Sequence, residues 1–145
     1  TVFNPAPASE VDEDIFSHID YFTPNETEAS FYVNHKVENE QDAKKASEKL
    51  LKLGIKNIII TLGDKGAYFA NNEESFHVNA MNLGEKVVDT TGAGDAFNAG
   101  FAVALTEDKN INDSITFANI TAGLSTTKIG TAKSMPLRSE IDNLL

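Results

Sequence analysis

The chain contains a run of three isoleucines that is followed at once by a glycine turn. Ile58, Ile59 and Ile60 are apolar and β-branched, and segment 61–66 after them carries two glycines. A strand with one exposed face alternates apolar and polar side chains, whereas a strand covered on both faces is apolar throughout. The run therefore predicts an inner strand of a sheet that is covered on both sides.

Helix-like and strand-like patterns alternate along the 145 residues of the chain. The clearest helix is expected over residues 40–53, with Gly54 as its stop. Its apolar side chains recur at helical spacing, at Ala43, Ala46, Leu50 and Leu53.

Residues 23–26 have the pattern of a second helix start. Thr23 would cap this helix, with Pro24 at the first helical position and Glu26 at the third, as in a capping box. The helix is expected to run to about Val33.

The remaining elements follow from shorter patterns. Strands are expected at residues 1–4, 19–23, 67–70 and 75–78, the last two as an antiparallel hairpin across Asn71 and Asn72. Helices are expected at residues 11–18, 94–105, 111–127 and, opened by Pro136, 136–144. Together these elements predict one domain, an open α/β sheet with helices on both faces. In such sheets ligands bind beyond the carboxyl ends of parallel strands.

Segment 87–97 places two acids around a glycine turn at the start of a helix. Asp89 precedes the turn, which contains Gly92 and Gly94, and Asp95 follows it. Glycines at a helix N-terminus leave backbone N–H groups pointing outward, where the helix dipole favours an anion. Asp95 would add a proton acceptor, and phosphoryl transfer to a hydroxyl needs both features side by side. The alternative is a plain turn in which Thr91 or Asp95 caps the helix.

This segment resembles the C-terminal signature of the ribokinase family of carbohydrate kinases, Asp-Thr-x-Gly-Ala-Gly-Asp-x-Phe. Three more segments are similar to motifs of that family's nucleotide-binding half, in order and at similar spacing: Asn-Pro-Ala-Pro-Ala at 4–8, Thr-Pro-Asn-Glu-Thr-Glu at 23–28 and Thr-Leu-Gly-Asp-Lys-Gly at 61–66. Nothing resembles the family's N-terminal sugar-binding half or its β lid. The resemblance implies a Rossmann-like sheet, the C-terminal half of a ribokinase-like fold, over residues 1–145.

The resemblance also implies a function, the ATP-dependent phosphorylation of a sugar hydroxyl, most simply D-ribose to ribose 5-phosphate. This chain would supply the ATP site and the catalytic base, Asp95. Segments 4–8 and 23–28 have the form found in ribokinases themselves. Two alternatives stay open: a kinase of the same family for another sugar or a nucleoside, and a nucleotide-binding fragment without catalysis. The intact enzyme would be a homodimer formed through the lid.

By the same resemblance, the nucleotide would contact Asn25, Thr61, Leu62, Gly63, Asp64, Lys65, Gly66, Gly92, Ala93, Gly94 and Asn119. Segment 61–66 follows a buried strand, where glycines let the backbone approach a ligand, but a tight turn alone explains it equally well. Asn119 aligns with a position near the adenine, although an asparagine within a helix is more often solvated or locally bonded.

Two metal sites are implied. Asn25 and Glu28 resemble an Asn-x-x-Glu motif that positions Mg²⁺ and phosphate largely through water, in keeping with the waters that Mg²⁺ retains. The alternative is a capping box, which explains Glu26 better than Glu28. A potassium site would use mostly backbone carbonyls, with side-chain oxygens from two of its residues, Asp89 and Ser134. The whole set is Asp89, Thr91, Ser125, Lys128, Gly130 and Ser134. Here the alternative is an ordinary C-terminal loop.

The composition argues against several classes of function. A formal net charge of −10 leaves no basic stripe for a nucleic acid or an acidic membrane, so bound ATP would need metal ions and oriented amides. The absence of cysteine excludes disulfides and thiolate metal sites, and His18, His35 and His77 are too scattered for a metal triad. No apolar run could span a membrane and no signal-peptide pattern is present, so we expect a cytoplasmic protein.

Overall fold

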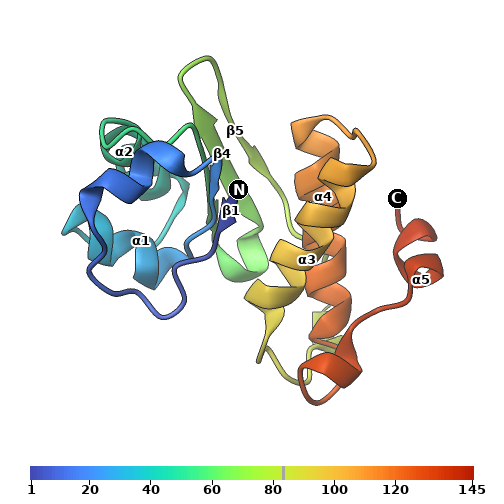
Figure 1. Ribbon diagram of the computed structural model, residues 1–145. Helices are drawn as coiled ribbons and strands as arrows, with labels where there is room; N and C mark the ends of the chain where they lie inside the picture. Colours follow the sequence, from blue (N-terminus) through green and yellow to red (C-terminus); the bar gives the residue numbers. More distant parts are fainter. Residues whose placement is uncertain (83) are drawn as a thin grey trace. The chain divides into compact units, whose positions relative to one another are not determined.

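The computed structural model describes residues 1–82 and 84–145 and divides into two compact units. The first unit, Thr1–Val78, contains the β-sheet and helices α1 and α2, and the second, Asn79–Leu145, contains helices α3 to α5 (Figure 1). In the described part of the chain, no helix is both long enough and apolar enough to cross a membrane.

The sheet of the first unit has five strands in the order β1-β2-β3-β4-β5. Their bounds are Val2–Phe3 for β1, Tyr21–Phe22 for β2, Asn57–Thr61 for β3, Ala67–Asn71 for β4 and Ser75–Val78 for β5. Strands β1, β2 and β3 are parallel, whereas β4 and β5 are antiparallel to their neighbours, which confirms the predicted hairpin. The carboxyl ends of β1 to β3 therefore lie at one edge of a mixed sheet.

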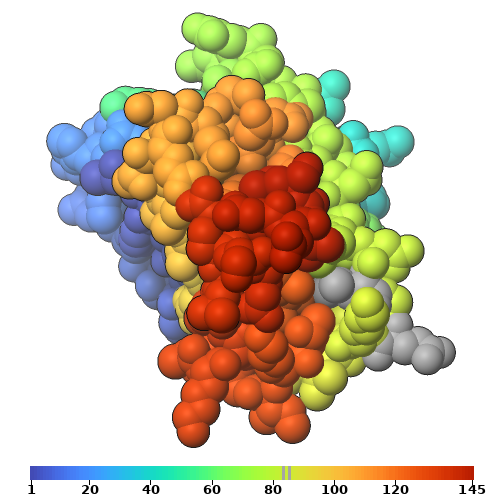
Figure 2. Space-filling view, turned by 90° about the vertical axis from the view of Figure 1, so that its right-hand side faces the viewer, coloured from blue at the N-terminus to red at the C-terminus, as the bar shows by residue number. Residues whose placement is uncertain are grey.

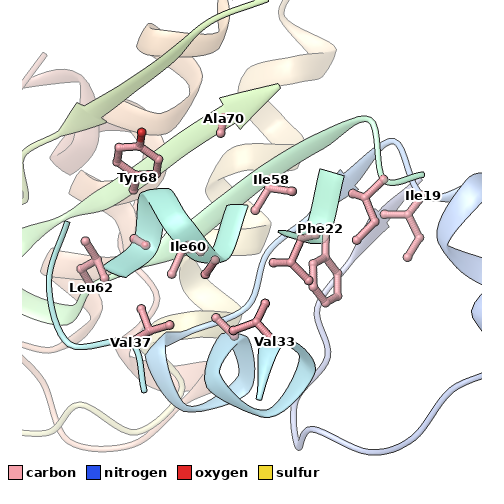
Figure 3. Close-up of a cluster of buried hydrophobic side chains, with 14 of the residues drawn as sticks. Ile19, Phe22, Val33, Val37, Ile58, Ile60, Leu62, Tyr68 and Ala70 are labelled. Carbon is pink, nitrogen blue, oxygen red and sulfur yellow. The ribbon is translucent and has the colours of Figure 1, made fainter. Parts of the chain in front are cut away.

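Two helices, α1 (Glu26–Val33) and α2 (Glu40–Leu51), lie on one face of this sheet (Figure 1). Figure 3 shows the apolar cluster beneath them, in which Ile58 and Ile60 of β3 lie with Val33 of α1. Ile59 points to the opposite face, because side chains alternate along a strand, and it is fully buried as well. The prediction of an inner strand buried on both faces is confirmed.

In the second unit, α3 (Ala93–Thr106) and α4 (Ile111–Ser125) pack against each other (Figure 1). Their contact is close at Gly100, where an added Cβ would come 2.6 Å from Thr121 Oγ1. The short helix α5 (Arg138–Asp142) packs on α4 through an apolar cluster that includes Ile141, and its outer side is visible in red in Figure 2.

Several predicted boundaries are wrong for local reasons. Thr23 does not cap α1, because its N–H donates to the carbonyl of Phe3 at 3.0 Å and keeps it extended beside β1. Asn25 is the cap instead, and its side chain accepts from the N–H of Glu28 at 2.9 Å. Pro24 and Glu26 are therefore the residues before and after the cap.

Other helices are shorter than expected. Helix α2 ends at Leu51, so Leu53 lies in the following turn and is 39% exposed rather than part of the core. Pro136 precedes the first turn of α5, whose N-cap is Leu137. The expected helix over residues 11–18 is a 3₁₀ helix over Glu13–His18.

Candidate active site

The glycine turn at the start of α3 leaves two backbone N–H groups free. Gly92 is the N-cap residue at φ +78°, and no side chain of the described residues caps the helix. The N–H of Ala93 donates to the carbonyl of Thr90 at 3.2 Å. Among the described residues, the N–H groups of Gly94 and Asp95 have no acceptor. Free N–H groups at the positive end of a helix dipole form an anion site.

Asp95 is exposed in the first turn of α3. The alternative in which Thr91 or Asp95 caps this helix is wrong, because Gly92 occupies the cap position with its backbone alone. Within residues 1–82 and 84–145, the Asp95 carboxylate forms no hydrogen bond or ion pair. A carboxylate that is free of partners beside two free N–H groups can accept a proton from a bound hydroxyl.

Gly92 and Gly94 are glycines for different reasons. At Gly92 the positive φ disfavours any side chain, and an added Cβ would come 3.0 Å from Thr131 Cγ2. At Gly94 the backbone is helical, and within the described part of the chain an added Cβ would meet no atom within 4 Å. Neither the backbone nor internal packing requires glycine at position 94. The open space fits a group bound from outside, such as a phosphate.

Asp89 connects the glycine turn to the loop after α4. Its Oδ1 accepts from the N–H of Thr91 at 2.9 Å, and its Oδ2 accepts from the N–H of Gly130 at 3.0 Å. These hydrogen bonds lower the pKa of the Asp89 carboxyl from 3.8 to about 2, and the bond from the Gly130 N–H has the largest effect. The carboxylate is therefore ionised at neutral pH and joins the two loops.

The predicted potassium residues all lie in the second unit, and three of them, Asp89, Thr91 and Gly130, are joined by these hydrogen bonds. Ser134 is fully buried, and its Oγ donates to the carbonyl of Thr131 at 2.6 Å. A charged carboxylate, a buried hydroxyl and nearby backbone carbonyls are hard oxygen donors of the type that suits an alkali or alkaline-earth cation.

The side chains of the other two predicted potassium ligands are engaged elsewhere. Ser125 Oγ donates to the carbonyl of Ala122 at 2.7 Å within α4. Lys128 Nζ lies 3.1 Å from Glu140 Oε1 in an ion pair. The Lys128 side chain is therefore no cation ligand, whereas the Ser125 hydroxyl oxygen keeps its lone pairs, as that of Ser134 does.

In the first unit, the structure brings the Asn25 motif and segment 61–66 together. Asn25 and Thr61 form a parallel bridge, and the N–H of Thr61 donates to the carbonyl of Pro24 at 3.0 Å. Both segments directly follow parallel strands, β2 and β3. They therefore meet at the carboxyl edge of the sheet, where ligands of open α/β sheets bind.

Asn25 and Glu28 form a reciprocal capping box. Glu28 Oε2 accepts from the N–H of Asn25 at 2.8 Å, while the Asn25 side chain accepts from the N–H of Glu28. Glu28 is 7% exposed, and burial raises the pKa of its carboxyl group against the opposing effect of the Asn25 N–H. A bound cation would offset this burial, and Oε1 has no hydrogen bond to the described residues. The predicted capping alternative is thus present, at Glu28 rather than Glu26.

The turn over segment 61–66 is tight and uses its glycines structurally. Gly63 and Gly66 have φ values of +57° and +107°, and the N–H of Leu62 donates to the carbonyl of Gly66 at 2.8 Å. The Leu62 side chain is 1% exposed and belongs to the apolar cluster of Figure 3. Its side chain is therefore a core group, and only its backbone could face a nucleotide.

The middle of the same turn is open to solvent. Asp64 and Lys65 are exposed, and Thr61 is half-buried. Lys65 Nζ donates to the carbonyl of Glu38 at 2.8 Å, which holds the turn against the connection that precedes α2.

Asn119 lies in the second unit on α4 and is 8% exposed. Its Nδ2 donates to the carbonyl of Asn79 at 3.2 Å, a residue 40 positions earlier in the chain, so the side chain is bonded to a distant segment rather than solvated. Two residues that the sequence did not single out lie beside predicted site residues of the second unit. Thr131 lies against Gly92, and Glu140 pairs with Lys128. No motif marks them.

Comparison with known proteins identifies the family to which the chain belongs. The chain belongs to the pfkB family of carbohydrate kinases, whose family model matches residues 1–138. It is 40% identical over 145 residues to a ribokinase of Staphylococcus aureus (strain COL), which is 99% of this chain and 47% of that relative. A deoxyribokinase of Salmonella typhi is 34% identical over 145 residues, again 99% of this chain and 47% of the relative.

Among solved structures, the ribokinase of Arabidopsis thaliana complexed with ribose and ATP is similar to this chain with a TM-score of 0.92. The two are 32% identical, and the match covers 99% of this chain and 46% of the other. This likeness confirms the predicted fold class. The chain spans about half the length of the curated relatives it matches.

Proposed function

We propose that this chain supplies the ATP site and the general base of a kinase that transfers the terminal phosphate of ATP to a hydroxyl of D-ribose. The observation that supports it most is the pair of free N–H groups at Gly94 and Asp95 beside an unengaged carboxylate. The ribokinase relatives, one of them solved with ribose and ATP, support the choice of phosphate donor and acceptor.

In this mechanism the N–H groups of Gly94 and Asp95 donate hydrogen bonds to the terminal phosphate. The sugar oxygen forms a bond to phosphorus while the bond to the departing ADP breaks. The hydroxyl proton passes to the Asp95 carboxylate. Because phosphoryl transfer is mostly a matter of positioning and charge stabilisation, the carboxylate mainly orients the hydroxyl and takes its proton late.

Residues of the first unit are proposed to contact the nucleotide and its metal. Thr61 and the backbone of segment 61–66 are the nucleotide contacts, and Asn25 with Glu28 would hold Mg²⁺ through water. When bound, Mg²⁺ neutralises charge on the phosphates. In the second unit, Asn119 is the proposed contact near the base.

A potassium ion is proposed near Asp89, Gly130 and Ser134. Its charge would hold the loop after α4 and the glycine turn in one arrangement. The intact kinase is further proposed to be a cytoplasmic homodimer that dimerises through the lid carried by the other half of the fold.

A second candidate acceptor is a deoxyribose. The Salmonella typhi deoxyribokinase matches this chain over the same length as the ribokinase does, so the nucleotide half by itself does not separate the two sugars. In the family pattern the acceptor is selected by the sugar-binding half, which this chain does not resemble.

The test is a coupled assay of ADP release with ribose, 2-deoxyribose and no sugar, on the complete polypeptide that carries this chain. Asp95→Asn should lower kcat by about 10²–10⁴-fold, because the proton acceptor is lost while the N–H groups remain. The KM for ATP should stay nearly the same. Asp108→Asn, two residues beyond the last residue of α3, is the matched control and should keep full turnover. Near-normal turnover of Asp95→Asn would exclude Asp95 as the base.

A further inference from the structure

The glycine turn of α3 is supported by a neighbouring loop, residues 126–134, through a contact that the proposed mechanism does not use. An added Cβ on Gly92 would come 3.0 Å from Thr131 Cγ2 and 3.3 Å from Thr131 Cβ. The methyl side of Thr131 therefore lies directly against the backbone of Gly92. Gly92 precedes the two free N–H groups, so its φ and ψ angles set the direction in which they point.

Thr131 is itself held in place from two sides. The backbone N–H and the Oγ of Ser134 both donate to the carbonyl of Thr131, at 3.2 and 2.6 Å. On its other side, the N–H of Gly130 donates to Asp89 Oδ2. Because Asp89 also accepts from Thr91, the turn and the loop are connected on both sides of the Thr131 contact.

The loop is also attached to α5, at the surface in Figure 2. Lys128 pairs with Glu140, whose other oxygen accepts from the N–H of Leu137 at 2.6 Å. Arg138 pairs with Glu107, the residue that ends α3. The loop that carries Thr131 is therefore joined to the start of α3 directly and to its end through α5.

We propose that Thr131 is a positioning residue for phosphoryl transfer, and that its γ-methyl group is the part that acts. A glycine in the left-handed region has many other conformations available. The methyl group removes some of them by contact, so that the N–H groups of Gly94 and Asp95 keep the geometry of the transition state. This inference depends on the proposed function, since it concerns the same turn.

The side chain of Thr131 allows the methyl and the hydroxyl to be tested separately. Thr131 is exposed, and its hydroxyl donates no hydrogen bond to the described residues. Thr131→Val keeps the γ-methyl and loses the hydroxyl, whereas Thr131→Ser keeps the hydroxyl and loses the methyl. The same pair of changes at Thr116, a half-buried residue of α4 whose Oγ1 donates to the carbonyl of Asn112 at 2.9 Å, is the control.

We expect Thr131→Ser to lower kcat about tenfold and to leave the KM for the sugar unchanged, because small displacements of reacting groups are costly. Thr131→Val should keep kcat within about twofold of the unsubstituted enzyme. A role in stability alone would instead lower the melting temperature of Thr131→Ser and leave kcat per folded enzyme unchanged.

Full kcat in Thr131→Ser, or an equal loss in both variants, would overturn the inference. A large loss in Thr131→Val alone would overturn it too, because it would assign the role to the hydroxyl. Assaying Asp95→Asn beside them separates a failure of the positioning role from a failure of the proposed function. If Asp95→Asn is inactive while Thr131→Ser is fully active, only the positioning role fails. If Asp95→Asn keeps near-normal turnover, the role of Asp95 as the base in the proposed function fails.

Discussion

Two glycines in one turn of α3 have separate tasks. Gly92 is required by its positive φ and by the contact with Thr131, so it shapes the turn. Gly94 has a helical backbone and, within the described residues, no neighbour that a side chain would meet. The fold of the described residues therefore does not require the second glycine, whereas the proposed phosphate would.

The first prediction concerns Gly94→Ala. Alanine is favoured over glycine in a helix by about 1 kcal/mol, so the free energy of unfolding should stay the same or rise by up to about that amount. The added methyl would occupy the space proposed for the phosphate, so the affinity for ATP should fall about tenfold. Isothermal titration with ATP and urea unfolding of the complete polypeptide measure the two effects. Unchanged ATP affinity would contradict a phosphate site at Gly94.

The second prediction concerns the pH dependence of Asp89. Folding lowers the pKa of the Asp89 carboxyl from 3.8 to about 2. The stability that this carboxylate contributes is therefore fully present above about pH 3.8 and is lost as the pH falls towards 2. Asp89→Asn should therefore lower the free energy of unfolding at pH 7, and the difference from the unsubstituted protein should shrink between about pH 4 and pH 2.

Urea unfolding at pH 7, 5, 4 and 3 measures this effect. Asp108→Asn removes one carboxylate charge at a residue whose side chain has no hydrogen bond within the described part of the chain, and it is the control for the loss of charge alone. A difference for Asp89→Asn that stays constant over the whole pH range would show that the carboxylate charge is not what joins the loops.

At the scale of elements, the sequence predicted the long helices and the hairpin because their patterns are locally complete. Helices α3 and α4 lie within two residues of their expected ends. The errors lie where tertiary contacts decide a boundary. Thr23 has the side chain of a cap, but its pairing with Phe3 keeps it extended. Leu53 continues the apolar spacing of α2, yet the helix has already ended.

The sequence predicted the features of the candidate site that depend on local backbone conformation. It did not predict the features that depend on contacts between separate loops. The free N–H groups follow from glycines at a helix start, which the sequence displays. The contact of Thr131 with Gly92 and the pairing of Glu140 with Lys128 join separate segments, so no local pattern indicates them. The capping role of Glu28 was missed because it requires the cap to be placed at Asn25.

The third prediction concerns the packing of α3 on α4. An alanine at Gly100 would place its Cβ 2.6 Å from Thr121 Oγ1 and 2.8 Å from Thr121 Cβ. Gly100→Ala should therefore lower the free energy of unfolding by about 1–3 kcal/mol, as overpacking of a helix contact does. Gly94→Ala in the same helix is the matched control, with no loss of stability expected. If urea unfolding shows equal stability for both variants, the two helices are not in close contact at Gly100.

At the scale of the molecule, each compact unit contributes a different kind of group. The first unit places Asn25, Glu28 and the turn of segment 61–66 at the carboxyl edge of its sheet. The second unit places the free N–H groups and Asp95 at the start of α3. A net charge of −10 means that neither unit attracts ATP by bulk charge. Directed backbone N–H groups and bound cations are therefore the expected means of holding the phosphates.

The start of α3 is proposed to bind the terminal phosphate beside Asp95. The most direct measurement is a crystal structure of the complete polypeptide with a non-hydrolysable ATP analogue. We expect terminal-phosphate oxygens about 2.7–3.2 Å from the backbone nitrogens of Gly94 and Asp95, with the Asp95 carboxylate facing the same phosphate. A triphosphate bound elsewhere, or a carboxylate turned away from it, would contradict the account.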